Sequence, residues 1–187
     1  MNRRELLKMI ALATGGVVIG SEFLLTGCKN TEASGNFSLT EKEIAFLDEV
    51  AETIIPTTNT PGAKAAKVGA FMQLMVTDCY NTNDQVIFKK GITTLDEACR
   101  KQTSKKFMDC TAEERKSFLT TVDAETKKYQ REKKKEDPNH YFQMMKQLTL
   151  FGYFSSEIGA TKALRNNPVP GKYDGAFPYK KGDRAWS

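Results

Sequence analysis

The apolar residues of this chain recur at the spacing of amphipathic helices. Thr40 and Glu43 form a capping box, and the apolar positions after it continue at intervals of three and four as far as Pro56. This pattern predicts a helix that begins near residue 40 and ends before Pro56. The turn-forming residues of 57–62 follow, and a second helix is expected over 68–80. The residues expected on its inward face are Val68, Phe71, Met75 and Cys79.

Two more helices are predicted in the middle of the chain. The first opens at Thr82, with Gln85 at the box position, and Gly91 inside it counts against helix stability. The residues expected to point inward from it are Val86, Ile87, Leu95 and Cys99. Thr111 and Glu114 form the next capping box and start a fourth helix. The residues expected to pack this fourth helix are Phe118, Leu119 and Val122.

The helical pattern continues beyond this point. The fourth helix is expected to run on into the charged stretch 127–136 and to stop before Pro138. A fifth helix begins near His140, and a further short one is expected over 158–164. The residues expected to pack the fifth helix are Tyr141, Met144, Met145, Leu148 and Phe151. No alternating run is long enough for a strand, so the predicted fold is all-α, a small irregular bundle of about five to six helices.

The chain beyond residue 165 has a different character. Prolines, glycines and asparagines in 166–175 favour turns, so this aromatic-rich tail is expected to be extended. It either wraps back onto its own domain or lies against another protein. Aromatic residues on such a segment suit an interface, because they bury large areas at low entropic cost. In the alternative, they close the bundle's own core, to which Phe151 and Phe154 are expected to contribute. The candidate interface residues are Phe154, Glu157, Tyr173, Phe177, Tyr179 and Trp186.

Residues 1–27 are predicted to be a signal for export. Arg3 and Arg4 precede an uncharged stretch, 9–20, which three glycines interrupt. That stretch is too short for a spanning helix, which takes about 20 apolar residues. Paired arginines before a mildly apolar run resemble the twin-arginine signal, which exports proteins that are already folded. An ordinary secretory signal that begins with two arginines is the alternative.

Cys28 stands at the end of this signal, after a leucine, a threonine and a glycine. This pattern resembles the lipobox of bacterial lipoproteins, in which the cysteine is acylated and becomes the first residue of the mature chain. The polar segment 28–39 is then a flexible tether, and 40–187 is the folded domain. The protein is therefore expected in the cell envelope, exported to the periplasm and lipid-anchored to a membrane. A free cysteine after a secretory signal is the alternative.

The charge of the chain does not point to nucleic acid. The formal net charge of +5 is mild, and much of the basic excess lies in 127–136. Export argues further against a nucleic-acid partner. A solvated helix face is the favoured interpretation of this basic run, and contact with anionic lipid headgroups is the alternative.

Residues that could carry chemistry are scarce. The single histidine, His140, cannot supply a metal cluster and has no evident nucleophile beside it, so a surface or capping role is favoured. Glu157 and Asp174 are as readily ion-pair partners or helix caps as catalytic acids. The chain has no glycine-rich nucleotide fingerprint and no Cys-x-x-Cys-His. No catalytic, cofactor or metal site is therefore predicted in it.

Three cysteines remain beyond Cys28, namely Cys79, Cys99 and Cys110. An exported compartment permits disulfides, but an odd number leaves at least one thiol unpaired. Burial as small apolar residues is expected for all three. Whether two of them form a disulfide is left open by the sequence.

Three stretches of the chain carry a resemblance to a known family. They are 47–66, which contains Thr60-Pro61-Gly62-Ala63, then 71–80, and then 148–160, which contains Gly152-Tyr153-Phe154-Ser155-Ser156-Glu157 and continues at 168–175. Together with the signal, they resemble the small subunit, subunit 3, of gluconate 2-dehydrogenase and related sugar dehydrogenases. The middle of the chain, about 85–135, adds nothing distinctive to the resemblance.

The resemblance implies a non-catalytic subunit. In this family the catalytic partner is a GMC-type flavoprotein that binds FAD, and a multihaem cytochrome c often takes the electrons onward. The small subunit carries the twin-arginine signal and is needed for export or maturation of the partner. A lipobox departs from a simple cleaved signal and would add anchoring to these duties. The competing interpretation is a free-standing, lipid-anchored envelope protein that binds a ligand or an envelope component.

Overall fold

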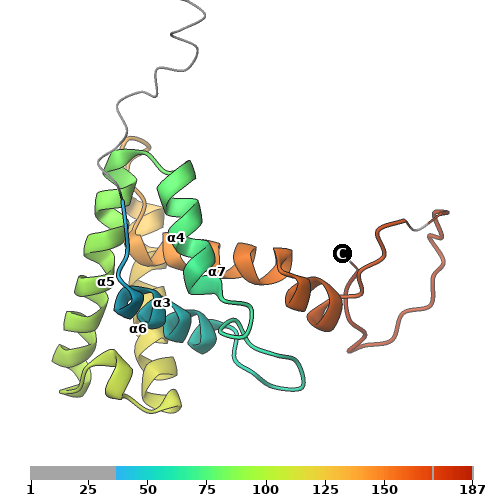
Figure 1. The fold of residues 1–187 in the computed structure, drawn as a ribbon, viewed down its shortest axis with the longest axis horizontal. Coiled ribbons are helices and arrows are strands. Elements are labelled where there is room, and N and C mark those ends of the chain that lie inside the picture. Colours follow the sequence, from blue (N-terminus) through green and yellow to red (C-terminus); the bar gives the residue numbers. More distant parts are fainter. Residues whose placement is uncertain (1–36, 170, 187) are drawn as a thin grey trace, which may run out of the picture. The chain divides into compact units, whose positions relative to one another are not determined.

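Five α-helices make up most of the part that the computed structural model describes, residues 37–169 and 171–186 (Figure 1). The helices are α3 (Glu41–Ile54), α4 (Val68–Cys79), α5 (Thr82–Thr103), α6 (Ala112–Glu132) and α7 (Tyr141–Ser155). A short 3-10 helix, η1 (Phe107–Asp109), precedes α6, and a π-helix, η2 (Gly159–Ala163), follows α7. These described ranges contain no strand, which confirms the all-α prediction. The predicted export residues Arg3 and Arg4 and the predicted lipidation site Cys28 lie outside them.

The capping residues confirm two predicted capping boxes and correct the third, although α5 begins at Thr82 as predicted. Thr40 and Thr111 both form complete capping boxes with the glutamate three residues on. The cap of α5 is Asn81, whose Oδ1 accepts a hydrogen bond from the backbone N–H of Asp84 at 2.9 Å. Gln85 is therefore not a box residue. Its Nε2 turns inward and donates to three carbonyl oxygens at the C-terminal end of α4, at 3.0 to 3.2 Å.

The inward face of α4 differs from the prediction. The residues that α4 buries are Val68, Gly69, Met72 and Val76. Phe71 and Met75 are half-buried and pack against the edge of the core, whereas Cys79 is exposed, so the prediction was wrong for Cys79. The helix is apolar on more than one side, and helical spacing alone therefore allowed two stripes. The stripe that packs inward repeats at intervals of four residues.

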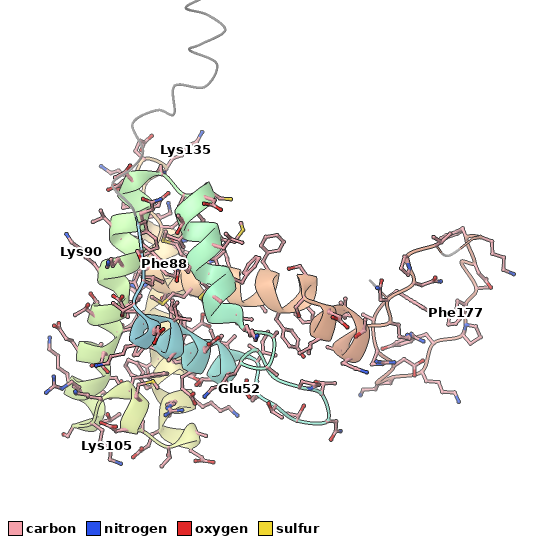
Figure 2. The ribbon with its side chains drawn as sticks, in the orientation of Figure 1. Glu52, Phe88, Lys90, Lys105, Lys135 and Phe177 are labelled. Carbon is pink, nitrogen blue, oxygen red and sulfur yellow. The ribbon has the colours of Figure 1, made fainter. Side chains whose placement is uncertain are left out.

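The inward residues of α5 and α6 are largely those predicted. Leu95 and Cys99 are buried, whereas Val86 is exposed and Phe88 takes an inward position. Figure 2 shows Phe88 on α5 pointing toward α4. Val86 is displaced because the adjacent Gln85 occupies the buried site, where its amide meets the open carbonyls at the end of α4. All three residues predicted to pack α6 are buried, and α6 ends before Pro138 as expected.

Two glycines allow close helix packing. A Cβ at Gly69 would lie 2.5 Å from the carbonyl oxygen of Ile44, so α3 and α4 approach backbone to backbone. A Cβ at Gly91 would lie 2.5 Å from the Cβ of Tyr141. Gly91 was expected to weaken α5, yet its position is the one that makes room for the start of α7.

The aromatic residues near the end of α7 point in different directions from those predicted. The helix passes unbroken through Gly152, and the buried aromatic residue near its end is Tyr153, which is 1% exposed. Phe151 and Phe154 are exposed, so the expectation that they contribute to the core was wrong. Tyr153 shares one helical face with the buried residues at 145, 149 and 152, whereas Phe151 and Phe154 point away from that face.

Candidate functional site

The loop between α3 and α4 is held by one carboxylate. Glu52 Oε1 accepts hydrogen bonds from the backbone N–H and the hydroxyl of Thr57, at 2.8 and 2.7 Å. Its Oε2 accepts from the backbone N–H of Lys64 at 2.9 Å. A Cβ at Gly62 would collide with Glu52 Oε2, so a larger residue there would displace the carboxylate from these bonds. Figure 2 shows Glu52 near the end of α3, beside this loop.

The three stretches that carry the family resemblance contact one another around this loop. The hydroxyl of Tyr153 on α7 donates to the carbonyl oxygen of Pro61 in the loop, at 2.6 Å. Phe71 on α4 packs against Gly152, where a Cβ would lie 2.5 Å from its ring. The rings of Phe71 and Phe151 also meet edge to face, with centroids 5.5 Å apart. The distinctive sequence segments therefore build one corner of the bundle.

A network of charged side chains fastens α3 to α6. Glu49 forms an ion pair with Arg115 and accepts a hydrogen bond from Lys64 Nζ at 2.7 Å. The Arg115 Nε also donates to the carbonyl oxygen of Phe107 at 2.9 Å. Burial acts to raise the pKa of Glu49, but Lys64 and Arg115 outweigh it and hold the pKa below its ordinary value. Every member of the network is paired, which indicates a structural role.

An apolar surface borders the corner that these contacts build. We call Phe71, Leu74, Phe151 and Phe154 the apolar face of α4 and α7. Leu74 is 58% exposed and Phe154 is 42% exposed, while the Phe71–Phe151 pair joins the two helices. The two helices carry one charged residue each, Asp78 and Lys146. Large exposed apolar residues grouped on one surface are typical of protein–protein interfaces.

The tail, residues 165–186, closes into a loop of its own (Figure 1). Arg165 donates from its backbone N–H to the carbonyl oxygen of Ala185 at 2.8 Å. Its guanidinium lies 4.4 Å from the centroid of the Trp186 ring. Arg184 Nη1 donates to the carbonyl oxygen of Lys162 in η2, at 2.8 Å. The start and end of the tail are thereby pinned together beside η2.

The segment between these pinned ends stays open to solvent. No described residue of the tail is buried, and the side chain of Tyr173 is 95% exposed. The rings of Phe177 and Trp186 meet edge to face at 5.5 Å and line a cavity of 780 Å³. Figure 2 shows Phe177 on this loop, away from Phe88 in the helical bundle. The aromatic residues of the described tail therefore do not pack in the core of the bundle, and the alternative that they close this core is wrong for them.

The predicted interface residues fall into two groups. Phe154 lies on the apolar face, and Glu157 is exposed just before η2. The other four lie together on the tail and are exposed; they are Tyr173, Phe177, Tyr179 and Trp186. Sequence reasoning missed Leu74 as an exposed apolar residue, because it named only the residues expected on the inward face of α4. The single charged residue along α4, Asp78, is the signal that could have identified this exposed apolar surface.

His140 has the capping role that the sequence favoured. Its Nδ1 accepts a hydrogen bond from the backbone N–H of Phe142 at 3.2 Å and lies 3.0 Å from the hydroxyl of Thr126. Burial holds the pKa of His140 below its ordinary value. Asp174 accepts from the backbone N–H of Ala176 at 3.1 Å and so serves a turn. Within the described ranges, no group of three histidine, cysteine or carboxylate side chains could hold a metal ion.

The comparisons with known proteins bear on this arrangement. A family model described as gluconate 2-dehydrogenase subunit 3 matches residues 41–171, from the start of α3 into the tail. No curated protein and no solved structure matches the chain. Among the helices of the described residues, none has the length and apolar character needed to cross a membrane.

Proposed function

The chain belongs to the gluconate 2-dehydrogenase subunit 3 family, and from this we propose that it is a non-catalytic accessory subunit of a membrane-associated, FAD-dependent sugar or gluconate dehydrogenase complex. The observation that carries the proposal is the family match over 41–171, which spans the five α-helices of the described residues. Catalysis and FAD belong to a GMC-type flavoprotein partner, and haem c belongs to a third subunit where one is present. This chain aids maturation, export or anchoring of the flavoprotein.

Two surfaces suit the contact with that flavoprotein. The apolar face of α4 and α7 presents large apolar side chains on helices that carry a single charge each. The tail presents Tyr173, Phe177, Tyr179 and Trp186, residue types that are enriched where interfaces derive most of their binding energy. Both surfaces adjoin α7 or the η2 segment after it, so one partner could cover them together.

Copurification of the flavoprotein tests the assignment. The tagged chain, expressed with the other subunits of its complex, should bring down a yellow protein that contains FAD. The chain made without partners should be colourless and should not oxidise sugars. FAD bound at near one per chain in the isolated protein would overturn the accessory role. A chain that leaves its native membrane alone, with no flavoprotein, would favour the free-standing lipoprotein.

Two variants separate the proposed docking surfaces. Deletion of 176–187 should leave the helical fold and its melting nearly intact while flavoprotein copurification is lost, because none of residues 176–186 is buried. Replacement of Leu74 and Phe154 together by serine should weaken copurification in the same way. Val86→Ser on α5 is the matched control, because Val86 is an exposed apolar residue outside both surfaces. If the truncated chain unfolds, or still holds its partner at full yield, the tail is not a docking surface.

The export part of the proposal rests on Arg3, Arg4 and Cys28. Replacement of both arginines by lysine keeps the charge but should leave this chain and its flavoprotein in the cytoplasm, because the pair is an address read by a receptor. Cys28→Ser should yield an unacylated precursor or a soluble form, because stable anchoring takes more than one acyl chain. Unchanged export in the first variant would refute the twin-arginine signal. Lipid labelling that persists in the second would refute the lipobox.

A further inference from the structure

Two buried cysteines face each other where α5 leads into α6. Cys99 lies in the last turns of α5, and Cys110 lies in the short connection after η1. Both are buried, and their Sγ atoms are 3.6 Å apart. The hydroxyl of Thr103 lies 3.6 Å from the first sulfur and 3.5 Å from the second. The third cysteine of the domain, Cys79, is exposed at the end of α4.

We propose that Cys99 and Cys110 form an intrachain disulfide in the exported protein. A disulfide bond is about 2.05 Å long, so the two sulfurs need to approach by only about 1.5 Å. Cys110 can supply this movement, because it lies in extended backbone between η1 and α6 rather than inside a helix. The inference rests on the export part of the proposed function, since disulfides persist in oxidising compartments.

The reaction is a thiol–disulfide exchange with a disulfide-bearing oxidant, either a dithiol oxidase or a small-molecule disulfide. One cysteine, as its thiolate, attacks a sulfur of the oxidant to form a mixed disulfide and releases one thiol. The other cysteine then attacks its partner's sulfur and releases the second thiol of the oxidant. The protein loses two protons and two electrons, and the oxidant disulfide gains them as two thiols.

Burial governs how this exchange proceeds. It raises the pKa of the Cys99 thiol to about 11, which makes the reactive thiolate scarce while the domain stays closed. Oxidation of the closed chain is therefore slow, and once the bond has formed, the burial of both sulfurs keeps external reductants from reaching it. A chain exported in its folded state arrives with these two thiols already adjacent. This geometry selects Cys110 as the partner of Cys99 and leaves Cys79 out.

Tryptic mapping of the full chain from its native envelope tests the bond directly. Free thiols are first alkylated in denaturant without reductant. Trypsin then releases Cys99 in the peptide 91–100 and Cys110 in the peptide 107–115. The expected product is these two peptides joined, with a mass two hydrogens below their sum, and Cys79 alkylated. Exported chain in which both peptides are alkylated separately would overturn the proposal, as would a bond that includes Cys79.

A second arm separates this inference from the export assignment. Full-length reduced protein, incubated with oxidised glutathione at mildly alkaline pH, should form the same linked peptides. Linkage should raise the melting midpoint by roughly 5–10 °C, as expected for a bond that closes a loop of this length. Cys79→Ser should keep this rise and Cys110→Ser should lose it. If the purified protein forms the linked peptides in vitro while the chain in cells stays unlinked in the cytoplasm, export is refuted and the pairing is supported. If the linked peptides form in neither experiment, the pairing is refuted.

Discussion

The hydrogen bond from Tyr153 to Pro61 ties the end of α7 to the loop after α3, across 92 positions of sequence. Tyr153→Phe removes the hydroxyl and keeps the ring in its buried site. The carbonyl oxygen of Pro61 then loses a partner in a half-buried position. Loss of one such bond costs about 1–2 kcal/mol when the remaining group cannot reach water freely. For a domain of this size, that lowers the melting midpoint by roughly 3–6 °C.

The chain offers a matched control for this measurement. The hydroxyl of Tyr129 also donates to a proline carbonyl, that of Pro138, at 3.0 Å, but at an exposed position. Water replaces this bond when the hydroxyl is removed, so Tyr129→Phe should change the unfolding free energy by less than about 0.5 kcal/mol. Urea unfolding followed by helical circular dichroism gives both values under the same conditions. Equal losses for the two variants would refute the reasoning that the Tyr153 bond anchors the loop.

Three further predictions concern packing, pH and charge. Gly69→Ala should cost about 1–3 kcal/mol in urea unfolding, because its Cβ meets the backbone of α3, whereas Gly175→Ala on the exposed tail should be nearly neutral. Because burial lowers the pKa of His140, the free energy of unfolding should fall as the pH drops through the ordinary histidine value of 6.5. His140→Asn keeps a cap, so its free energy of unfolding should change less between pH 7 and 5. Glu49→Gln should cost about 1–3 kcal/mol at pH 7, because it leaves the half-buried Arg115 guanidinium without its ion pair. The variant should also lose less stability than the wild type as the pH falls through 4.5, while the share due to other carboxylates with a lowered pKa, such as Asp123, should remain.

Helix positions were predictable because their signals are local. The capping boxes at Thr40 and Thr111 depend on residues three positions apart, and each box forms as predicted. The cap of α5 was missed because Thr82 and Asn81 are adjacent and both are good caps. The choice between them depends on Gln85, which is drawn inward by carbonyls that α4 leaves open. These carbonyl groups belong to another helix, so the sequence of α5 alone does not reveal that Gln85 turns inward.

Contacts between distant segments could not be predicted in the same way. Glu49 and Arg115 are 66 positions apart, and nothing in their local sequence links them. The same holds for the position of Cys99 beside Cys110, because the spacing of 11 residues fits many geometries. The sequence limited the number of cysteine pairs to one. Only the path of the chain through η1 determines which pair is close enough.

The burial of aromatic residues shows where hydrophobic pattern stops being informative. On α7, Phe151, Tyr153 and Phe154 are all strongly apolar, and composition favours the phenylalanines for the core. Tyr153 is nevertheless the buried one, because its hydroxyl finds the carbonyl of Pro61 and its position continues the inward stripe. Two phenylalanines then remain on the surface of a domain whose core is complete without them. The stability of this domain alone does not explain large apolar residues at these exposed positions. We infer that a partner protein covers this face.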